Sequence, residues 1–346
     1  MSVQPDPTNV PWHETTQHER NRLIFEEELD AFLPARILDF HTHVLNEGII
    51  PEGETYSCGG HAMAKYDLDD LARDLAELYP GRQTQALCFG LPHPQYDQQR
   101  SDAYLAAHCD GQRFFPLRLF DPEQDTPELL QEALGSGQFL GIKPYPDYVR
   151  KANPATVEIH EMLPAWAMEI IDAQGAIVML HIPRSGRLAD PLNQRQIVEL
   201  CRRYPRAKIV LAHIGRAYFL KNITGQLDAL AALPNLYYDL AMVGHWEVMA
   251  YLFHRVPHDH ILYATDLPIA VAPGKSVEIN NQYTYITPVP WELSISDDHG
   301  KLTFTAFAYE ELRAIKRAVQ HLELDANFVE GIFHNNGMRL IEDPAG

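Results

Sequence analysis

The fold is decided by residues 177–214, which read IVMLHIPRSGRLADPLNQRQIVELCRRYPRAKIVLAHI. Two apolar runs, at 177–182 and 208–214, flank a segment at 193–204 whose apolar residues fall at helical spacing. Strands that are apolar along nearly their whole length, joined by a helix, are typical of a parallel sheet whose outer face is covered. This stretch therefore predicts one strand–helix–strand unit.

The same unit repeats along the chain from Arg36 onward. Six further strand candidates are ILDF (37–40), QALCFG (85–90), FFPLRLF (114–120), FLGIK (139–143), LYYDL (236–240) and ILYATD (261–266). Helical patterns lie between many of them, at 68–79, 127–137, 158–173 and 245–256. Eight such units close into a barrel, so we predict an α/β fold, a (β/α)8 TIM barrel. The alternative, an open doubly wound sheet, is disfavoured because no Gly-rich phosphate loop follows the first strand.

Three segments lie outside the barrel pattern. Residues 1–35 are polar and Pro-interrupted, with a candidate helix from Glu19 to Phe32, and are expected to form an N-terminal arm on a barrel domain of residues 36–346. Residues 271–307 contain QYTYIT, WELSIS and KLTFTAF with a turn at 297–300, which predicts a β-hairpin insertion after strand eight. An insertion there leaves the barrel at its C-terminal face, so it is a candidate lid, with an oligomer contact or a simple decoration of the barrel as the alternative. Residues 308–346 are expected to finish the chain with helices.

Composition narrows the function classes. The 346 residues carry a formal net charge of -19, which argues against nucleic acid or an anionic membrane as a partner. Four cysteines show no CxxC pairing, and the N-terminus lacks the basic start and apolar run of a signal peptide. No run approaches 18 apolar residues. We expect a cytoplasmic protein that acts on a small molecule, with homo-oligomerisation left open.

The first strand ends in His41-Thr42-His43. The period of two puts both imidazoles on one side of the strand, where they can bind one metal ion. Three further candidates stand at the ends of later strands: His181 after VML, His213 after VLA and Asp266 after LYAT. Each alone is as easily a hydrogen-bonded histidine or a helix-capping aspartate. Together they indicate a metal centre at one mouth of the barrel.

The runs ILDFHTH, GIKPYP, VMLHIPRSGR, IVLAHIG, LYATDLP and IFHNNGMRL resemble the amidohydrolase-2 (amidohydrolase-related) group of the amidohydrolase superfamily, over residues 36 to about 340. The resemblance implies that His41, His43, His181 and Asp266 bind one divalent ion, for which Zn²⁺ is expected, with His213 beside it. Asp266 is then the candidate general base. His213 is the second catalytic candidate, to polarise a carbonyl group or to protonate carbon in a decarboxylation.

Lys143, in GIKPYP at the end of strand four, bears on the number of metal ions. Binuclear members of the superfamily carry a carboxylated lysine on this strand, so a second ion held by Lys143 and His213 is an alternative. The GxKxxP run favours a mononuclear site in which Lys143 binds substrate or is structural.

Arginines near these residues bear on the substrate. Arg184 and Arg187 follow strand five, and Arg216 follows strand six. Because arginine recognises carboxylates, Arg184 and Arg216 are expected to bind an anionic substrate, although loop salt bridges are an equal alternative. Arg118 lies within an apolar run, where an unpaired charge is costly, so we expect it to point into the barrel toward the site.

The expected function is hydrolysis of an amide, lactone or ester bond in a small anionic molecule. The alternative is a metal-dependent, non-oxidative decarboxylase of an aromatic or unsaturated acid, because the group includes such enzymes with the same ligand set. A catalytically inactive metal-binding barrel is a third interpretation, but no ligand is missing from the set.

Overall fold

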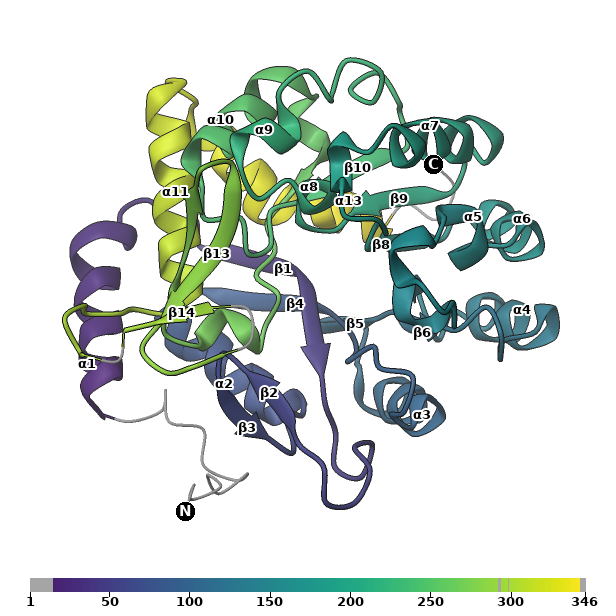
Figure 1. Ribbon diagram of the computed structural model, residues 1–346, viewed down its shortest axis with the longest axis horizontal. Helices are drawn as coiled ribbons and strands as arrows, with labels where there is room; N and C mark the ends of the chain where they lie inside the picture. Colours follow the sequence, from purple (N-terminus) through teal and green to yellow (C-terminus); the bar gives the residue numbers. More distant parts are fainter. Residues whose placement is uncertain (1–14, 292–293, 298, 343–346) are drawn as a thin grey trace.

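The chain forms a closed barrel of parallel strands inside a ring of helices, as a computed structural model of residues 15–291, 294–297 and 299–342 shows (Figure 1). Neighbouring strands pair in parallel in chain order. They are β1 (Arg36–Val44), β4 (Gln83–Gly90), β5 (Phe114–Pro116) with β6 (Arg118–Phe120), β7 (Gly141–Pro144), β8 (Ile177–Leu180), β9 (Lys208–Leu211), β10 (Leu236–Asp239) and β11 (Ile261–Leu262). The (β/α)8 barrel predicted from the sequence is confirmed.

Backbone hydrogen bonds close the barrel at two seams. The predicted third strand is interrupted at Leu117, whose N–H donates to the carbonyl of Cys88 at 2.8 Å and so continues the ladder. The last strand meets the first through the N–H of His43 on the carbonyl of Leu267 (2.7 Å) and the N–H of Asp266 on the carbonyl of His41 (2.9 Å). The second seam is therefore made by predicted metal-site residues.

The outer helices begin where capping residues predict. Asp67, Thr126 and Asp190 accept backbone N–H groups at the starts of three helices, which satisfies donors that the first turn leaves free. The ring includes α2 (Leu68–Leu78), α3 (Gln98–His108), α4 (Pro127–Gly135), α6 (Ala165–Gln174), α7 (Pro191–Arg203) and α10 (Trp246–Arg255). The single helix predicted over 158–173 is wrong. Pro164 separates α5 (Ile159–Met162) from α6, because proline lacks the N–H that a continuous helix needs.

The barrel interior is packed below the C-terminal mouth. Leu38, Phe40, Leu87, Leu117 and Met179 belong to one buried cluster inside the strands. Layers of apolar side chains of this kind fill TIM barrels, so the open space is confined to the mouth.

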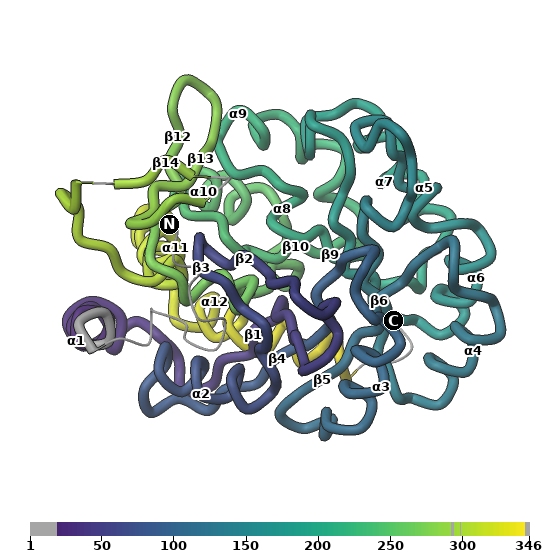
Figure 2. Tube along the Cα trace, turned by 60° about the horizontal axis from the view of Figure 1, so that its bottom comes forward, coloured from purple at the N-terminus to yellow at the C-terminus, as the bar shows by residue number. Residues whose placement is uncertain are grey.

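The insertion after strand eight contains the predicted β-hairpin, but its turn lies elsewhere. Strands β12 (Lys275–Ile279) and β13 (Gln282–Thr287) are antiparallel and joined by Asn280 and Asn281, both with positive φ. A two-residue hairpin turn needs that conformation, which asparagine tolerates. The predicted turn at 297–300 does not join the strands of a hairpin. Strand β14 (Ser294–Ser296) pairs in parallel with β13, and residues 301–306, which follow the turn, form no strand. Residue 298 lies outside the described residues. Figure 2 shows the hairpin beside α9 (Leu220–Ile223).

The two ends of the described chain pack on the barrel. Helix α1 (Thr15–Ile24) leads into a π-helical turn, η2 (Phe25–Leu29), whose Glu28 pairs with Arg313 of α11 (Phe307–His321). Residues 1–14 of the predicted arm lie outside the described residues. The chain finishes with α12 (Ala326–Glu330), a π-helical turn, η8 (Gly331–Asn335), and α13 (Asn336–Glu342), whose Leu340 reaches the interior cluster.

A second small hairpin was not predicted. Strands β2 (Tyr56–Cys58) and β3 (His61–Met63) pair in the loop after β1. No helix in the described ranges is both long and apolar enough to span a bilayer.

Candidate metal centre

The structure brings the five predicted metal-site residues together at the C-terminal mouth of the barrel. His41 and His43 lie on β1, His181 directly follows β8, His213 follows β9 after Ala212, and Asp266 follows β11. All five line a cavity of about 390 Å³. Backbone conformation contributes to this convergence, because His213 and Asp266 have φ of 57° and 71°. Such left-handed conformations are uncommon outside glycine and cluster at functional sites.

Three of the histidines are held through Nδ1 by oxygen atoms of the protein. Nδ1 of His41 lies 2.8 Å from Oδ2 of Asp239. The corresponding atoms of His43 and His213 lie 3.0 Å from the carbonyl of Gly90 and 2.9 Å from that of Ala241. A carbonyl oxygen only accepts, so Nδ1 carries the proton in both of these rings. A neutral ring held in this way offers the lone pair of Nε2, the usual arrangement of metal-binding histidines.

These Nε2 atoms converge on Asp266. Its Oδ1 lies 3.0 Å from Nε2 of His43 and 3.4 Å from Nε2 of His41. Ligand atoms of His41, His213 and Asp266 all lie within 4.8 Å of one another. Lone pairs directed at one another over such distances repel unless a cation, either a proton or a metal ion, lies among them. Nitrogen and carboxylate ligands in this number suit a divalent transition ion, so the residues fit the implied metal.

The ionisation states also fit a metal. Burial lowers the pKa of His41, His181 and His213, which favours neutral imidazoles. For Asp266, burial raises the pKa, but the hydrogen bond with His43 and the nearby imidazoles outweigh it and hold the pKa below its usual range. Neutral histidine and ionised carboxylate are the forms that bind metal.

His181 is held differently from the other three. Its Nδ1 is buried and has no hydrogen-bond partner among the described residues. Its ring packs against His213, with 5.5 Å between the ring centroids, and against Tyr145 at 4.6 Å. A buried polar atom without a partner indicates that the site is completed by something else, such as water or an ion.

Asp239 is a site residue that the sequence reasoning missed. It ends β10 and is fully buried, with Oδ2 on His41 and Oδ1 accepting the backbone N–H of His213 at 2.6 Å. Burial raises its pKa to about 6, although the groups of His213 oppose the shift. Its sequence signal was available, because the run LYYDL places a carboxylate at the end of strand seven.

Lys143 lies at the same centre. Its Nζ is 3.4 Å from Nε2 of His41 and lies over the ring of Phe89, 4.8 Å from the centroid. Burial lowers the pKa of Lys143 to about 8. The lysine is therefore close enough to contact His41, a predicted metal ligand, and its role as a substrate-binding or metal-bridging group stays a prediction.

The predicted substrate-binding arginines separate into two kinds. Arg216 lines the cavity, donates to the carbonyl of Ile182 at 3.2 Å, and has a buried Nε without a partner among the described residues. Arg184 instead pairs with Asp190, the cap of α7, at 3.0 Å. Arg216 is thus available to an anion, whereas Arg184 is engaged by a carboxylate.

The prediction that Arg118 points into the barrel is wrong. Phe115 and Leu117 belong to the interior cluster, so strand alternation turns Arg118 outward. There its guanidinium pairs with Asp102 of α3 at 3.0 Å and with Asp125 at 2.5 Å. The charge is compensated within the helical layer, away from the cavity.

The insertion supplies one wall of the cavity. Tyr283, Tyr285 and Trp291 line it together with Tyr145 and Tyr218 of the barrel loops. Tyr283 stacks on Tyr218, with 4.3 Å between ring centroids and 17° between planes. Arg187 lies over both rings, 4.7 Å and 5.1 Å from their centroids. The hairpin is therefore attached to the barrel by aromatic and cation–π contacts beside the site.

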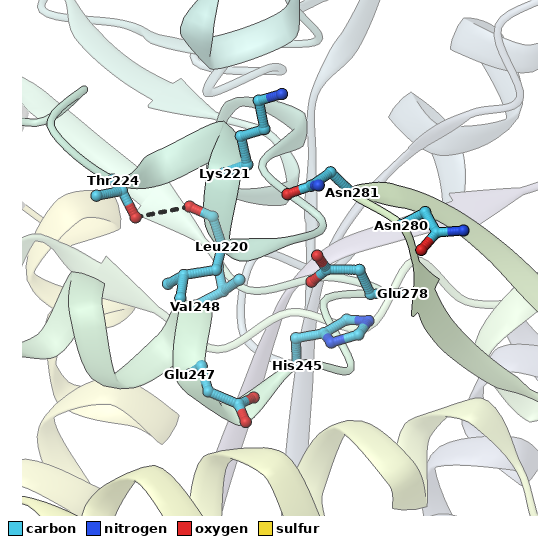
Figure 3. A pocket seen from close by; sticks show the side chains of 9 residues that line it. All are labelled: Leu220, Lys221, Thr224, His245, Glu247, Val248, Glu278, Asn280 and Asn281. Carbon is cyan, nitrogen blue, oxygen red and sulfur yellow. Dashed lines mark hydrogen bonds between the residues drawn. The ribbon is translucent and has the colours of Figure 1, made fainter.

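A second cleft, of about 750 Å³, lies at the far end of the hairpin (Figure 3). Its side chains come from the hairpin tip and from the starts of α9 and α10, and they include Glu278, Asn281, Lys221 and His245. Most of them are solvent-exposed, and none of the predicted metal-site residues lies among them. The hairpin thus borders this cleft beside its turn, while Tyr283 and Tyr285 of β13 line the cavity at the candidate metal centre.

The fold and the site are those of a barrel enzyme of the metal-dependent hydrolase or decarboxylase class, and comparison with known proteins agrees. The sequence profile described as Amidohydrolase matches residues 38–341. The chain belongs to this amidohydrolase family, the amidohydrolase-2 group that its motifs resemble. No curated protein sequence matches it significantly.

Three solved structures show the same fold at low sequence identity. A zinc-bound amidohydrolase from Burkholderia multivorans has 13% identity and a TM-score of 0.58, over 90% of this chain and 100% of that one. The 2,6-dihydroxybenzoate decarboxylase from Rhizobium has 12% identity and a TM-score of 0.53, over 89% of this chain and 99% of that one. A putative 2-pyrone-4,6-dicarboxylic acid hydrolase from Pseudomonas putida has 13% identity and a TM-score of 0.53, over 90% of this chain and 98% of that one. The chain is thus an enzyme of a family with both hydrolases and decarboxylases among its structural relatives.

Proposed function

We propose that this protein is a hydrolase that holds one divalent ion, Zn²⁺ in our expectation, with His41, His43, His181 and Asp266. The observation that carries the proposal is the convergence of Nε2 of His41 and His43 on one carboxylate oxygen of Asp266. A bound divalent ion lowers the pKa of water toward neutrality and polarises a carbonyl group. The zinc-bound relative of the same fold supports the choice of metal.

In this proposal the chain's own residues divide the remaining work. Asp266 is ionised and takes the proton of the attacking water. His213 presents Nε2 to the cavity, because its Nδ1 is engaged by Ala241, and once Nε2 has taken up a proton it donates to the oxygen of the reacting carbonyl. Arg216 and Lys143 supply the positive charge that binds an anionic group of the substrate. A centre of two ions, in which Lys143 and His213 would hold the second, is the alternative metal count.

Non-oxidative decarboxylation is the second candidate, and the aromatic lining of the cavity favours it. Tyr145, Tyr218, Tyr283 and Trp291 offer flat apolar surfaces to a planar acid. In that reaction His213 would first take up a proton at Nε2 from water and would then deliver it to the ring carbon that loses CO₂. The decarboxylase from Rhizobium shows that this fold accommodates such chemistry in a relative.

The two candidates are separated by their products. Purified protein, loaded with Zn²⁺ or Mn²⁺, is incubated with a panel of small amides, lactones, esters and aromatic acids. Ring or amide opening with an unchanged carbon count supports hydrolysis, and CO₂ release supports decarboxylation. Asp266→Asn is expected to lower either activity at least 10²-fold and to reduce metal content measured by plasma emission. Full activity in this variant, or metal-free active protein, would overturn the proposal.

The proposal also covers the cellular location and the partners of the enzyme. All four cysteines are free, in keeping with a reducing compartment, and we place the protein in the cytoplasm. Its partner in this proposal is the small-molecule substrate, with self-association open to measurement.

A further inference from the structure

Glu311, on the inner side of α11, is buried although it carries an ionisable group. Its Oε2 accepts the backbone N–H of Met242 at 2.8 Å, and its Oε1 has no partner among the described residues. Burial raises the pKa of Glu311 well above its ordinary value. Burying a carboxyl group for one hydrogen bond is costly, which indicates that the contact with Met242 has a structural purpose.

The N–H that Glu311 accepts belongs to the peptide group between Ala241 and Met242. The carbonyl oxygen of the same peptide group, on Ala241, lies 2.9 Å from Nδ1 of His213. Glu311 and His213 therefore hold the two ends of one peptide group. Hydrogen bonds in such a chain polarise one another and strengthen together.

This peptide group is the centre of a tight turn. The N–H of Val243 donates to the carbonyl of Leu240 at 3.1 Å, and Met242, the third residue of the turn, has a φ of 57°. A positive φ at this position is typical of a type II turn, in which the central peptide is flipped relative to the commoner type I turn. Methionine disfavours this conformation, so contacts must hold it.

We propose that Glu311 is a positioning residue for His213, which it controls by holding the Ala241–Met242 peptide in the flipped orientation. In that orientation a carbonyl oxygen meets the ring, so the proton stays on Nδ1 and Nε2 keeps its lone pair for the cavity. In the opposite orientation the peptide N–H would approach Nδ1, and the proton would move to Nε2. Glu311 thus selects the tautomer of His213 from outside the barrel.

Asp239 does not duplicate this role. Its Oδ1 accepts the backbone N–H groups of His213 and Ala241, at 2.6 Å and 3.2 Å. Those contacts fix the backbone before the turn, but they leave the following peptide free to rotate about its neighbouring bonds. Glu311 accepts the N–H of that peptide.

The test is a direct measurement of the tautomer in metal-free protein. Protein labelled with ¹⁵N in its histidines gives distinct side-chain signals for the two tautomers, and His213→Gln identifies the signal of His213. The expected wild-type result is the Nδ1–H form. A wild-type His213 in the Nε2–H form overturns the inference without any variant.

Variants of Glu311 then test the cause. Glu311→Leu removes the acceptor, and Glu311→Asp shortens the side chain by one methylene group. Each is expected to raise the Nε2–H population of His213 and to lower kcat at least about 10-fold, with a smaller change in KM. Glu311→Gln keeps an oxygen acceptor and the shape of the neutral acid, so it should retain the wild-type tautomer.

The matched control is Glu330→Gln, an exposed glutamate on α12 that should change neither the spectrum nor kcat. An unchanged His213 spectrum in folded Glu311→Leu or Glu311→Asp would contradict the inference. The catalytic consequence rests on the proposed role of His213, but the tautomer is measured without metal or substrate. The spectrum therefore decides the inference even if the proposed reaction is wrong.

Discussion

Oδ2 of Asp239 lies 2.8 Å from Nδ1 of His41, on the edge of the imidazole opposite the Nε2 atom that points to the cavity. The contact fixes the ring and increases its basicity. We predict that Asp239→Asn lowers metal affinity about 10- to 100-fold, measured by competition with a chromophoric chelator. Asp228→Asn, an exposed aspartate after α9, is the control. Equal metal affinities in the two variants would show that Asp239 does not support the metal centre.

Arg216 and Arg184 should differ in their effect on substrate. Replacing Arg216 by Met removes from the cavity a guanidinium that has no carboxylate partner among the described residues, so KM for an anionic substrate should rise about 10-fold or more. Arg184→Met should leave KM within about two-fold, because that side chain is engaged by Asp190. Steady-state kinetics with a charged substrate and its neutral ester separate the two. The opposite ranking would contradict the assignment of Arg216 as the anion-binding arginine.

Arg118 should matter for stability and not for binding. Its removal leaves Asp102 and Asp125 without their partner in the helical layer. Arg118→Met is expected to lower the free energy of unfolding by about 3 kcal/mol, as for other broken buried ion pairs. The measurement is denaturant unfolding, with KM determined in parallel. A KM effect without loss of stability would reinstate Arg118 as a substrate group.

The contact of Tyr283 with Tyr218 and Arg187 predicts that the hairpin slows the dissociation of substrate from the cavity. Tyr283→Ala removes the stacking that attaches the hairpin to the barrel, and KM should rise several-fold through a larger dissociation rate. Ile279→Ala, at the exposed tip of the same hairpin, is the control because its side chain is half exposed. Stopped-flow binding distinguishes the two variants. If both behave as wild type, the hairpin is not a lid.

Asp74 predicts a pH dependence of stability away from the metal centre. Burial on α2 raises its pKa to about 7, although Arg73 and Tyr66 oppose the shift, whereas the unfolded value is about 3.9. Between these values the folded protein keeps a proton that the unfolded chain releases, so this group destabilises the fold progressively as pH rises from about 4 to 7.

Asp74→Asn removes that titration. Relative to wild type, its free energy of unfolding should improve as pH rises from 5 to 8, by an amount on the order of a few kcal/mol. Urea unfolding at several pH values measures the difference. The exposed Asp69→Asn should show no such trend, and a flat difference for Asp74→Asn would refute the prediction.

The strands and the residues at their ends were predictable because parallel strands buried on both faces are apolar runs. In IVMLHI the polar residue that follows the run marks the end of β8, and the same rule locates His213 and Asp266. The turn at Asn280 and Asn281 was missed, because the run of Asp297 to Gly300 carries a similar turn signal.

The site contacts were less predictable for a different reason. The outward direction of Arg118 depends on which side of the strand Leu117 faces, and this is known only from the structure. Asp239 becomes significant only through its distance to His41. Glu311 lies in a helix far along the chain, and its spacing from Ala308 and Ile315 places it on the buried stripe of that helix, but the sequence does not show that it contacts Met242. Contacts between distant elements require coordinates.

The bond from the N–H of Asp266 to the carbonyl of His41 joins the last barrel strand to the first at the ligands themselves. During synthesis His41 and His43 emerge early, and Asp266 emerges only after seven of the strands have been made. The nascent chain therefore has only an incomplete site with which to capture an ion. For the proposed metal enzyme, this makes loading with metal one of the last expected events of maturation, so an occupied site would report that the whole ring has been completed.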